Sequence, residues 1–169
     1  MTDQPAFRFF PAAYDMGDVL ERSDAPCDVC GKPSVWLYAG TVYAEGEQPE
    51  VCARCIHGGQ LAAHFGGQDF QLHDADLSGA SEALTAEVMQ RTPGFATFNA
   101  FDWPVIDGQP LVFVGNGDAD AVWNDPELRA AITAAWKEEY EEDLDEPSSY
   151  ALVFRTLDGK QTRIVFDSD

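Results

Sequence analysis

Two short stretches decide the fold: Cys27-Asp28-Val29-Cys30-Gly31-Lys32 and Cys52-Ala53-Arg54-Cys55-Ile56. Each carries a C-x2-C pair, 21 residues separate the two pairs, and together they contain all four cysteines of the 169-residue chain. Because a C-x2-C loop turns the chain back on itself, two such loops can bring four thiolates to one point. We therefore predict that Cys27, Cys30, Cys52 and Cys55 bind one metal ion.

The chemistry of this ligand set favours zinc in a structural role. Four thiolates satisfy tetrahedral zinc at about 2.3 Å per bond and leave no coordination position for water or substrate. Iron accepts the same four ligands, so the sequence does not separate the two metals. Two redox-active C-x2-C pairs, or plain buried thiols, remain the alternative at this point.

The order of elements around the cysteines narrows the type of module. Residues 35–38 and 41–44 are β-prone and predict two short strands, or one strand bent at Gly40. The second cysteine pair leads into a predicted helix over residues 56–65, weakened by Gly58-Gly59. A knuckle, a hairpin and a second pair at a helix start is the treble-clef arrangement, whereas a zinc ribbon places that pair on another hairpin. We expect a treble-clef-like or zinc-ribbon-like zinc-binding module over residues 27–65.

Two further helices are expected outside this module. Ser81 can cap a helix that ends near Arg91, before Thr92-Pro93-Gly94. Asp125-Pro126 begins the second helix, because the carboxylate caps it and proline suits its first turn. Apolar residues then recur every fourth position and predict a helix over residues 126–144: Leu128, Ile132, Trp136, Tyr140 and Leu144.

Three apolar stretches, residues 111–115, 150–155 and 162–166, predict a small sheet that the second helix covers. Asp158-Gly159 predicts a hairpin between the last two strands, because glycine supplies the positive φ of a tight turn. Residues 1–26 are expected to form an extended arm that packs on the body through aromatic side chains. The fold class is therefore α+β, and we expect a single domain over residues 1–169.

Several stretches together resemble one known family. Residues 38–45 (Tyr-Ala-Gly-Thr-Val-Tyr-Ala-Glu) resemble a Y-x-G-x-V-Y-A/S-E motif, and residues 52–59 are similar to C-P-W-C-I-A-D-G. Residues 91–95 match an R-T-P-G-Y motif. Three further matches are Phe7-Arg8-Phe9, Trp103 and Phe113-Val114-Gly115. The ordered set of motifs over residues 7–165 resembles the CbrC family, also called the colicin E2 tolerance proteins.

The resemblance implies a bacterial cytosolic protein with a metal site at the four cysteines. It implies no reaction, because the family is named for a tolerance phenotype. Two family features are missing here. Residues 156–160 contain no cysteine where family members often carry C-x-x-C-G, and residues 105–107 replace a His-Cys pair. A second metal site or thiol function is therefore not carried over to this chain.

Charge restricts the classes of partner. Thirty Asp and Glu face ten Lys and Arg, which gives a formal charge of −20, and the basic residues are scattered singly. Such a surface repels phosphate backbones and anionic lipid, so we expect neither nucleic-acid nor membrane binding. The sequence shows no signal peptide and no apolar run of membrane-spanning length, so a cytoplasmic location is expected. In that reducing compartment, paired cysteines favour metal over disulfide.

The sequence combines a lack of common catalytic motifs with one dense acidic run. The sequence lacks a Ser-His-Asp set, a G-x-S-x-G elbow and a phosphate loop. An acidic run follows the long helix, where carboxylates oppose the helix dipole and lower stability: Glu138, Glu139, Glu141, Glu142, Asp143, Asp145 and Glu146. The run is either a solvated face or a docking surface. We hypothesise a non-enzymatic protein-interaction module whose partner is a basic protein.

An enzyme is the alternative hypothesis. Its site would lie in the aromatic and acidic segment 95–118, with Asp102 or Asp107 as acid or base and zinc as scaffold. His57, two residues after Cys55, is a candidate to hydrogen-bond a thiolate, although a solvated helix histidine is the simpler interpretation. The sequence determines neither the partner, nor a substrate, nor the oligomeric state.

Overall fold

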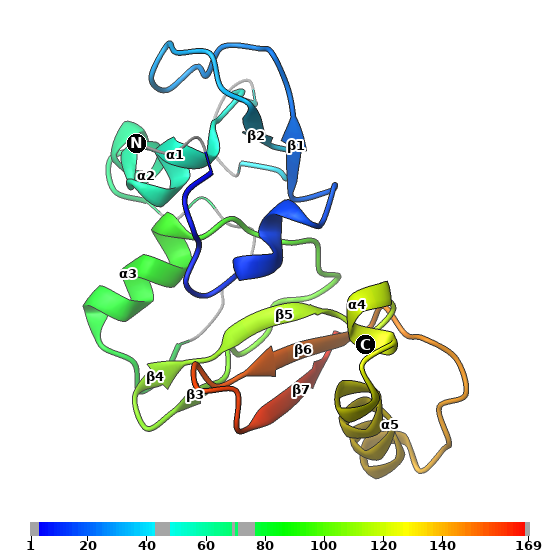
Figure 1. Ribbon diagram of the computed structural model, residues 1–169. Helices are drawn as coiled ribbons and strands as arrows, with labels where there is room; N and C mark the ends of the chain where they lie inside the picture. Colours follow the sequence, from blue (N-terminus) through cyan, green and yellow to red (C-terminus); the bar gives the residue numbers. More distant parts are fainter. Residues whose placement is uncertain (1–3, 43–47, 69, 71–76, 168–169) are drawn as a thin grey trace.

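The computed structural model, which describes residues 4–42, 48–68, 70 and 77–167, shows a mixed α+β fold (Figure 1). The cysteine-bearing residues lie at one end with four short elements: β1 (Leu20–Arg22), β2 (Trp36–Tyr38), α1 (Ala53–His57) and α2 (Gln60–His64). A three-stranded sheet lies at the other end: β5 (Val112–Asn116), β6 (Ala151–Arg155) and β7 (Thr162–Phe166). The mixed α+β class expected from the sequence is therefore confirmed.

The N-terminal arm packs on the body, as the sequence predicts. Phe7, Phe9 and Phe10 are buried, and a short 3-10 helix, η1 (Pro11–Tyr14), follows them. The Phe113 N–H donates to the Phe9 carbonyl at 2.8 Å, which joins the arm to β5. The arm therefore links the two ends of the molecule by burial and by a backbone hydrogen bond.

The strand pairing in the cysteine module differs from the prediction. β2 pairs antiparallel with β1, with Leu20 opposite Tyr38, and not with residues 41–42. The other side of β2 contacts the segment before α1, where the Tyr38 N–H donates to the Val51 carbonyl and Leu37 bridges to Cys52. The predicted pairing of 35–38 with 41–44 is wrong for the described residues, because both edges of β2 are already occupied. Residues 43 and 44 lie outside the described residues.

The helix predicted over residues 56–65 is divided into α1 and α2. Gly59 has a φ of 76°, a left-handed conformation that favours glycine, and it separates the two helices. The next helix, α3 (Glu82–Arg91), begins as predicted, with the Ser81 hydroxyl accepting from the Leu84 N–H. The sequence thus locates these helical residues, and the glycine pair decides where the helix breaks.

A small hairpin that the sequence did not indicate lies in the aromatic segment. β3 (Val105–Ile106) and β4 (Gln109–Pro110) pair across the turn Asp107-Gly108. Each strand has only two residues, which is too short for a period-2 pattern to show in sequence. Residues 105–110 therefore form an ordered turn next to β5.

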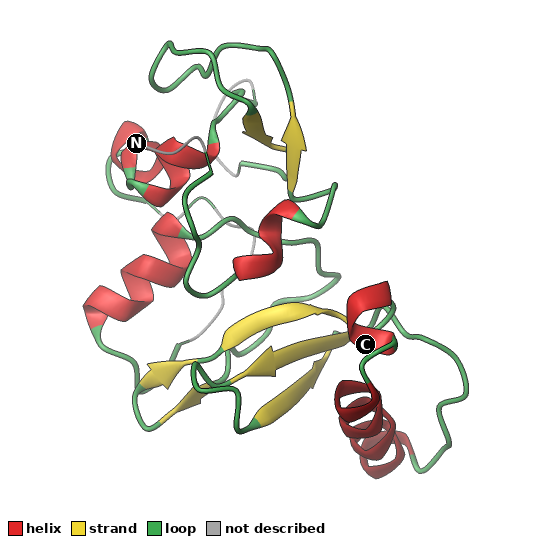
Figure 2. Cartoon of the chain, viewed as in Figure 1, coloured by secondary structure: helices red, strands yellow, loops and turns green. Residues whose placement is uncertain are grey.

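The three-stranded sheet matches the sequence prediction and has a different core on each face. The strand order is β5-β6-β7, both pairs are antiparallel, and the 157–160 hairpin joins β6 to β7 (Figure 2). Leu152 and Phe154 of β6 belong to the large buried cluster that also contains Cys27 and Cys52. Ala151 and Val153 belong to a second cluster under α4 (Asp120–Trp123) and α5 (Pro126–Tyr140). The central strand is buried on both faces as a result.

The long helix ends earlier than predicted. α5 begins at Pro126 under the Asp125 cap but ends at Tyr140, and Glu141 adopts a left-handed φ of 59°. Carboxylates that crowd the last turn oppose the helix dipole, which favours termination there. Leu144 therefore lies outside the helix and returns to pack against the second cluster. Leu144 continues the pattern of an apolar residue at every fourth position although it lies outside α5, because the chain folds back onto the cluster that α5 also covers.

Candidate metal centre

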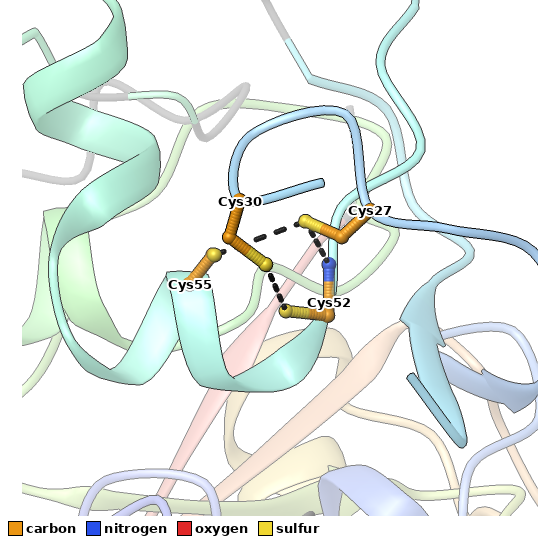
Figure 3. Close-up of side chains that lie close together, drawn as sticks. All are labelled: Cys27, Cys30, Cys52 and Cys55. Atoms are coloured by element: carbon orange, nitrogen blue, oxygen red, sulfur yellow. Dashed lines mark hydrogen bonds between the residues drawn. The ribbon is translucent and has the colours of Figure 1, made fainter. Parts of the chain in front are cut away.

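The four cysteines meet at one point with a spacing that fits a tetrahedral metal. The Cys27 and Cys55 sulfurs are 3.8 Å apart, the Cys30 and Cys52 sulfurs are 3.9 Å apart, and all four lie within 4.8 Å of one another (Figure 3). A zinc tetrahedron with bonds of about 2.3 Å has sulfur–sulfur edges of about 3.8 Å. All four cysteines are free, at separations far beyond the roughly 2.05 Å of a disulfide. The residues therefore fit a metal ion and not a pair of disulfides.

The first pair lies on a tight knuckle that is closed by its own backbone. The Gly31 N–H donates to the Cys27 carbonyl at 2.7 Å, and the Cys27 N–H donates to the Lys32 carbonyl at 3.0 Å. These bonds reverse the chain between the two sulfurs, as a C-x2-C spacing requires. Figure 3 shows both side chains of this loop directed toward the start of α1.

The second pair lies at the start of α1. Cys52 is the N-cap residue, and the Cys55 N–H donates to the Cys52 carbonyl at 2.9 Å, so both sulfurs project from the first helical turn. The Cys52 N–H also donates to the Cys27 sulfur at 3.3 Å. This contact places an amide dipole of the helix start against a thiolate of the knuckle.

Asp28 joins the two pairs and was not singled out from the sequence. Its N–H donates to the Glu50 carbonyl and its carboxylate accepts from the Glu50 N–H, each at 2.8 Å. These two bonds fix the knuckle beside the segment that leads into Cys52. A short polar residue between two cysteines was the only local signal, and its partner, 22 positions away, cannot be identified from spacing.

Burial and backbone hydrogen bonding shift the pKa values of the thiols in opposite directions. Burial raises the pKa of Cys52 and of Cys55. Burial also raises the pKa of Cys27, but backbone N–H groups that hydrogen-bond its sulfur outweigh this and lower its pKa to about 7. A bound cation stabilises all four thiolates, so metal binding and thiol deprotonation are coupled.

The site is closed to substrate. Cys27, Cys52 and Cys55 are buried, Cys30 is half-buried, and four sulfur donors fill a tetrahedron. A metal held there has no position left for water, so its chemistry is structural. Soft thiolates suit zinc or iron, and the geometry alone does not identify which.

The other sequence candidates lie elsewhere. The His57 ring packs edge-on against the Phe7 ring at 5.8 Å rather than bonding a thiolate. Asp102 and Asp107 are both exposed, Asp107 at the tip of the β3–β4 turn, so neither lies in an enclosed acid–base site. The surrounding aromatics Phe95, Phe101 and Trp103 are buried in the core. Among the described residues, no helix has the length and apolarity needed to cross a membrane.

Comparison with known proteins gives a family. The family described as "Uncharacterised protein family (UPF0167)" matches residues 4–168. The chain belongs to this family. A UPF0167 protein of Pseudomonas aeruginosa is 30% identical over 123 residues, which cover 70% of this chain and 66% of the relative. UPF0167 proteins of Mycobacterium bovis and Mycobacterium tuberculosis are each 30% identical over 129 residues, covering 76% of this chain and 68% of each relative.

These matches establish the family but no activity. The chain spans about two thirds of the length of the curated relatives it matches, and their names state only the family. The bacterial family expected from the sequence motifs is therefore supported, whereas the colicin E2 tolerance name is not carried by these matches. No solved structure matches the chain.

Proposed function

We propose that this UPF0167 protein is a zinc-stabilised, non-enzymatic protein-interaction module of the bacterial cytoplasm that binds a basic partner. The observation that carries the proposal is the closed arrangement of four sulfurs around one point. Such a site supplies folding free energy and leaves no open coordination position. The metal would then stabilise the fold, and the function would be carried out by the protein surface and not at the metal.

A structural zinc ion accounts for the small amount of regular structure near the cysteines. β1 and β2 have three residues each, and α1 has five. Elements this short contribute little stability on their own. Zinc binding is worth on the order of 10 kcal/mol in small zinc domains at neutral pH. Along the chain the order is β1, the knuckle, β2 and the start of α1, which differs from a treble clef because β1 precedes the knuckle, and one ion would tie all of these elements together.

The acidic segment after α5 supports a basic partner. All seven carboxylates of residues 138–146 are exposed, and within the described residues only Asp143 forms an ion pair, with Lys137 at 2.6 Å. Six of the seven carboxylates therefore have no cationic partner among the described residues. Their mutual repulsion lowers stability, and a cationic partner would relieve it.

An open hollow with a mixed polar and apolar lining lies beside this segment. It has a volume of about 520 Å³ and lies between α5 and the returning chain, lined by Trp123, Pro126, Arg129, Thr133, Leu144 and Asp145. Its lining is mixed, with the apolar side chains of Trp123 and Leu144 beside the Asp145 carboxylate and the Arg129 cation. The carboxylates of residues 138–146 would steer a basic segment toward this surface, and the apolar side chains would add contact area. Nucleic acid is disfavoured as the partner, since the same charges repel phosphates.

The metal part of the proposal is tested on the purified full chain. Elemental mass spectrometry with thiol counting is expected to give about one zinc per chain and four masked thiols. Metal-free protein with reactive or disulfide-bonded cysteines would overturn the structural zinc ion and favour thiol redox chemistry.

The partner part is tested with two charge-matched variants of the zinc-loaded protein. In the first, Glu138, Glu139 and Glu142 become glutamine. In the second, the exposed acids Asp18, Glu21 and Asp24, which lie near β1, become asparagine or glutamine. Basic proteins retained at low salt should be lost from the first variant and kept by the second. Equal loss from both, or retention of only neutral and acidic proteins, contradicts the docking surface.

A further inference from the structure

A small polar pocket lies next to the metal centre, on the other end of α1. It has a volume of about 80 Å³ and is bordered by the N-terminal arm, the end of α1 and the end of α3: Phe7, Arg8, His57, Glu87, Arg91 and Thr92. The metal centre uses none of these side chains. Three of the stretches that carry the family resemblance, residues 7–9, 52–59 and 91–95, meet here.

Positive charge gathers at this pocket in an otherwise strongly acidic protein. Two of the ten basic residues of the chain, Arg8 and Arg91, border it together with the His57 imidazole, and Glu87 is the one carboxylate in its wall. Arg8 reaches Glu87 at 3.4 Å, a long and partly exposed ion pair. Within the described residues, no carboxylate lies within ion-pair distance of Arg91. Within the part of the chain that the structure describes, the pocket therefore carries one positive charge, that of Arg91, without a carboxylate partner.

The two guanidinium groups are held in place by neighbouring groups. The Arg91 Nε–H donates to the His57 carbonyl at 2.9 Å, which orients the guanidinium, and among the described residues its terminal nitrogens form no other hydrogen bond. The Arg8 guanidinium lies over the Phe9 ring at 4.9 Å, and Phe9 is fully buried. Donors that are fixed before a ligand arrives lose less entropy when it binds.

We propose that this pocket binds one small oxyanion group, a carboxylate or a phosphate. Guanidinium groups form paired, charge-assisted hydrogen bonds to these planar or tetrahedral oxygens. The volume sets the size of the ligand. It holds a few water molecules, whereas pockets for whole metabolites measure about 300–1,000 Å³. The ligand is therefore an inorganic oxyanion or the anionic end of a larger molecule.

A substitution of Glu87 distinguishes an oxyanion-binding pocket from a purely structural ion-pair network, because the two predict opposite effects. Its carboxylate competes with the ligand for Arg8, and its own backbone carbonyl, not its side chain, accepts from the Thr92 hydroxyl. Glu87→Gln removes the competing charge and keeps the side-chain volume. If the pocket were only a structural ion-pair network, this substitution would weaken it. If the pocket binds an oxyanion, the substitution strengthens binding.

The experiment is calorimetric titration of the zinc-loaded full chain with inorganic phosphate and, separately, with acetate, at constant ionic strength. Four proteins are compared: wild type, Arg8→Gln, Glu87→Gln, and Arg163→Gln as a control. Arg163 is an exposed cation on β7, in the sheet at the other end of the molecule (Figure 1), so its loss changes the net charge equally. This test does not depend on the identity of any protein partner.

The expected result is saturable binding to wild type, weakened about tenfold or more by Arg8→Gln, strengthened by Glu87→Gln and unchanged by Arg163→Gln. Binding of phosphate but not acetate assigns a tetrahedral oxyanion, and binding of acetate assigns a carboxylate, including a peptide terminus. Failure of both anions to bind wild type overturns the proposal. So does equal weakening by Arg8→Gln and Arg163→Gln, which would show that only net charge matters.

Discussion

Asp167 offers the sharpest test of how the fold is held together. It follows β7, it is 3% exposed, and its carboxylate accepts hydrogen bonds from the Phe98 N–H at 2.5 Å and the Asn99 N–H at 2.7 Å. Its own N–H donates to the Tyr150 carbonyl at 2.8 Å. One side chain therefore attaches the loop around residue 98 to the end of the sheet.

The cost of removing this carboxylate follows from the groups it satisfies. Asp167→Ala deletes both acceptors and leaves two backbone N–H groups without their partner. Hydrogen bonds to a charged group contribute about 1.5–3 kcal/mol each, and the carboxylate no longer pays for its own burial, so the net loss is about 2–4 kcal/mol. For a chain of this length, that lowers the melting temperature by about 4–16 °C.

The assay is urea unfolding of the zinc-loaded protein, with amide hydrogen exchange at Phe98 and Asn99 as a local measurement. Glu138→Ala, which removes an exposed carboxylate, serves as the control and should change stability by less than about 0.5 kcal/mol. Asp167→Asn keeps one acceptor oxygen and should fall between the two. An Asp167→Ala protein as stable as the control, with unchanged exchange at both amides, would refute this account of the loop.

Two further predictions concern the metal centre and the last hairpin. Because burial raises the pKa of Cys52 and Cys55, the metal-free thiols hold their protons at neutral pH and zinc must displace them, so the apparent zinc affinity should fall by about tenfold per pH unit for each displaced proton as pH decreases. Competition with a chromophoric chelator between about pH 8 and pH 6 measures this, and a flat profile would exclude the thiolate site. Gly159 has a φ of 72° with open space around it, so Gly159→Ala should cost about 1–2 kcal/mol through backbone strain alone. Gly17→Ala is the control, since Gly17 has neither a positive φ nor a close neighbour; equal urea midpoints for the two variants would contradict the prediction.

Local chemistry explains why parts of this protein could be predicted from sequence. Ser81 and Asp125 cap helices through bonds to residues three or fewer positions away, and the hairpin after β6 is closed by hydrogen bonds among residues 156–161. The predicted ligand set also depends on a local property, because each C-x2-C loop prepares its own pair of sulfurs. The meeting of the two pairs was an inference from metal chemistry, and the sulfur distances now support it.

The choice of strand partner shows where local reasoning stops. Residues 35–38 are β-prone whichever strand lies beside them, and a short loop made residues 41–44 the nearest candidate. The structure instead uses β1, from the other side of the first cysteine knuckle, and the segment around Val51. Period-2 patterns specify that a strand exists, whereas its partner depends on which backbone edges remain free after the rest of the chain has packed.

The sequence by itself determined the four-cysteine candidate metal site, the helix caps, the three-stranded sheet and the acidity of the surface, because each depends on residue type and on neighbours a few positions away. Tertiary structure alone decided the bonds of Asp28 and Asp167 and the meeting of Arg8, His57 and Arg91 around one pocket. Asp167 lies 69 residues after Phe98 and 68 residues after Asn99 in the sequence. Such contacts form only after packing of the core has brought distant segments together. Neither periodicity nor spacing in the sequence predicts which distant segments meet.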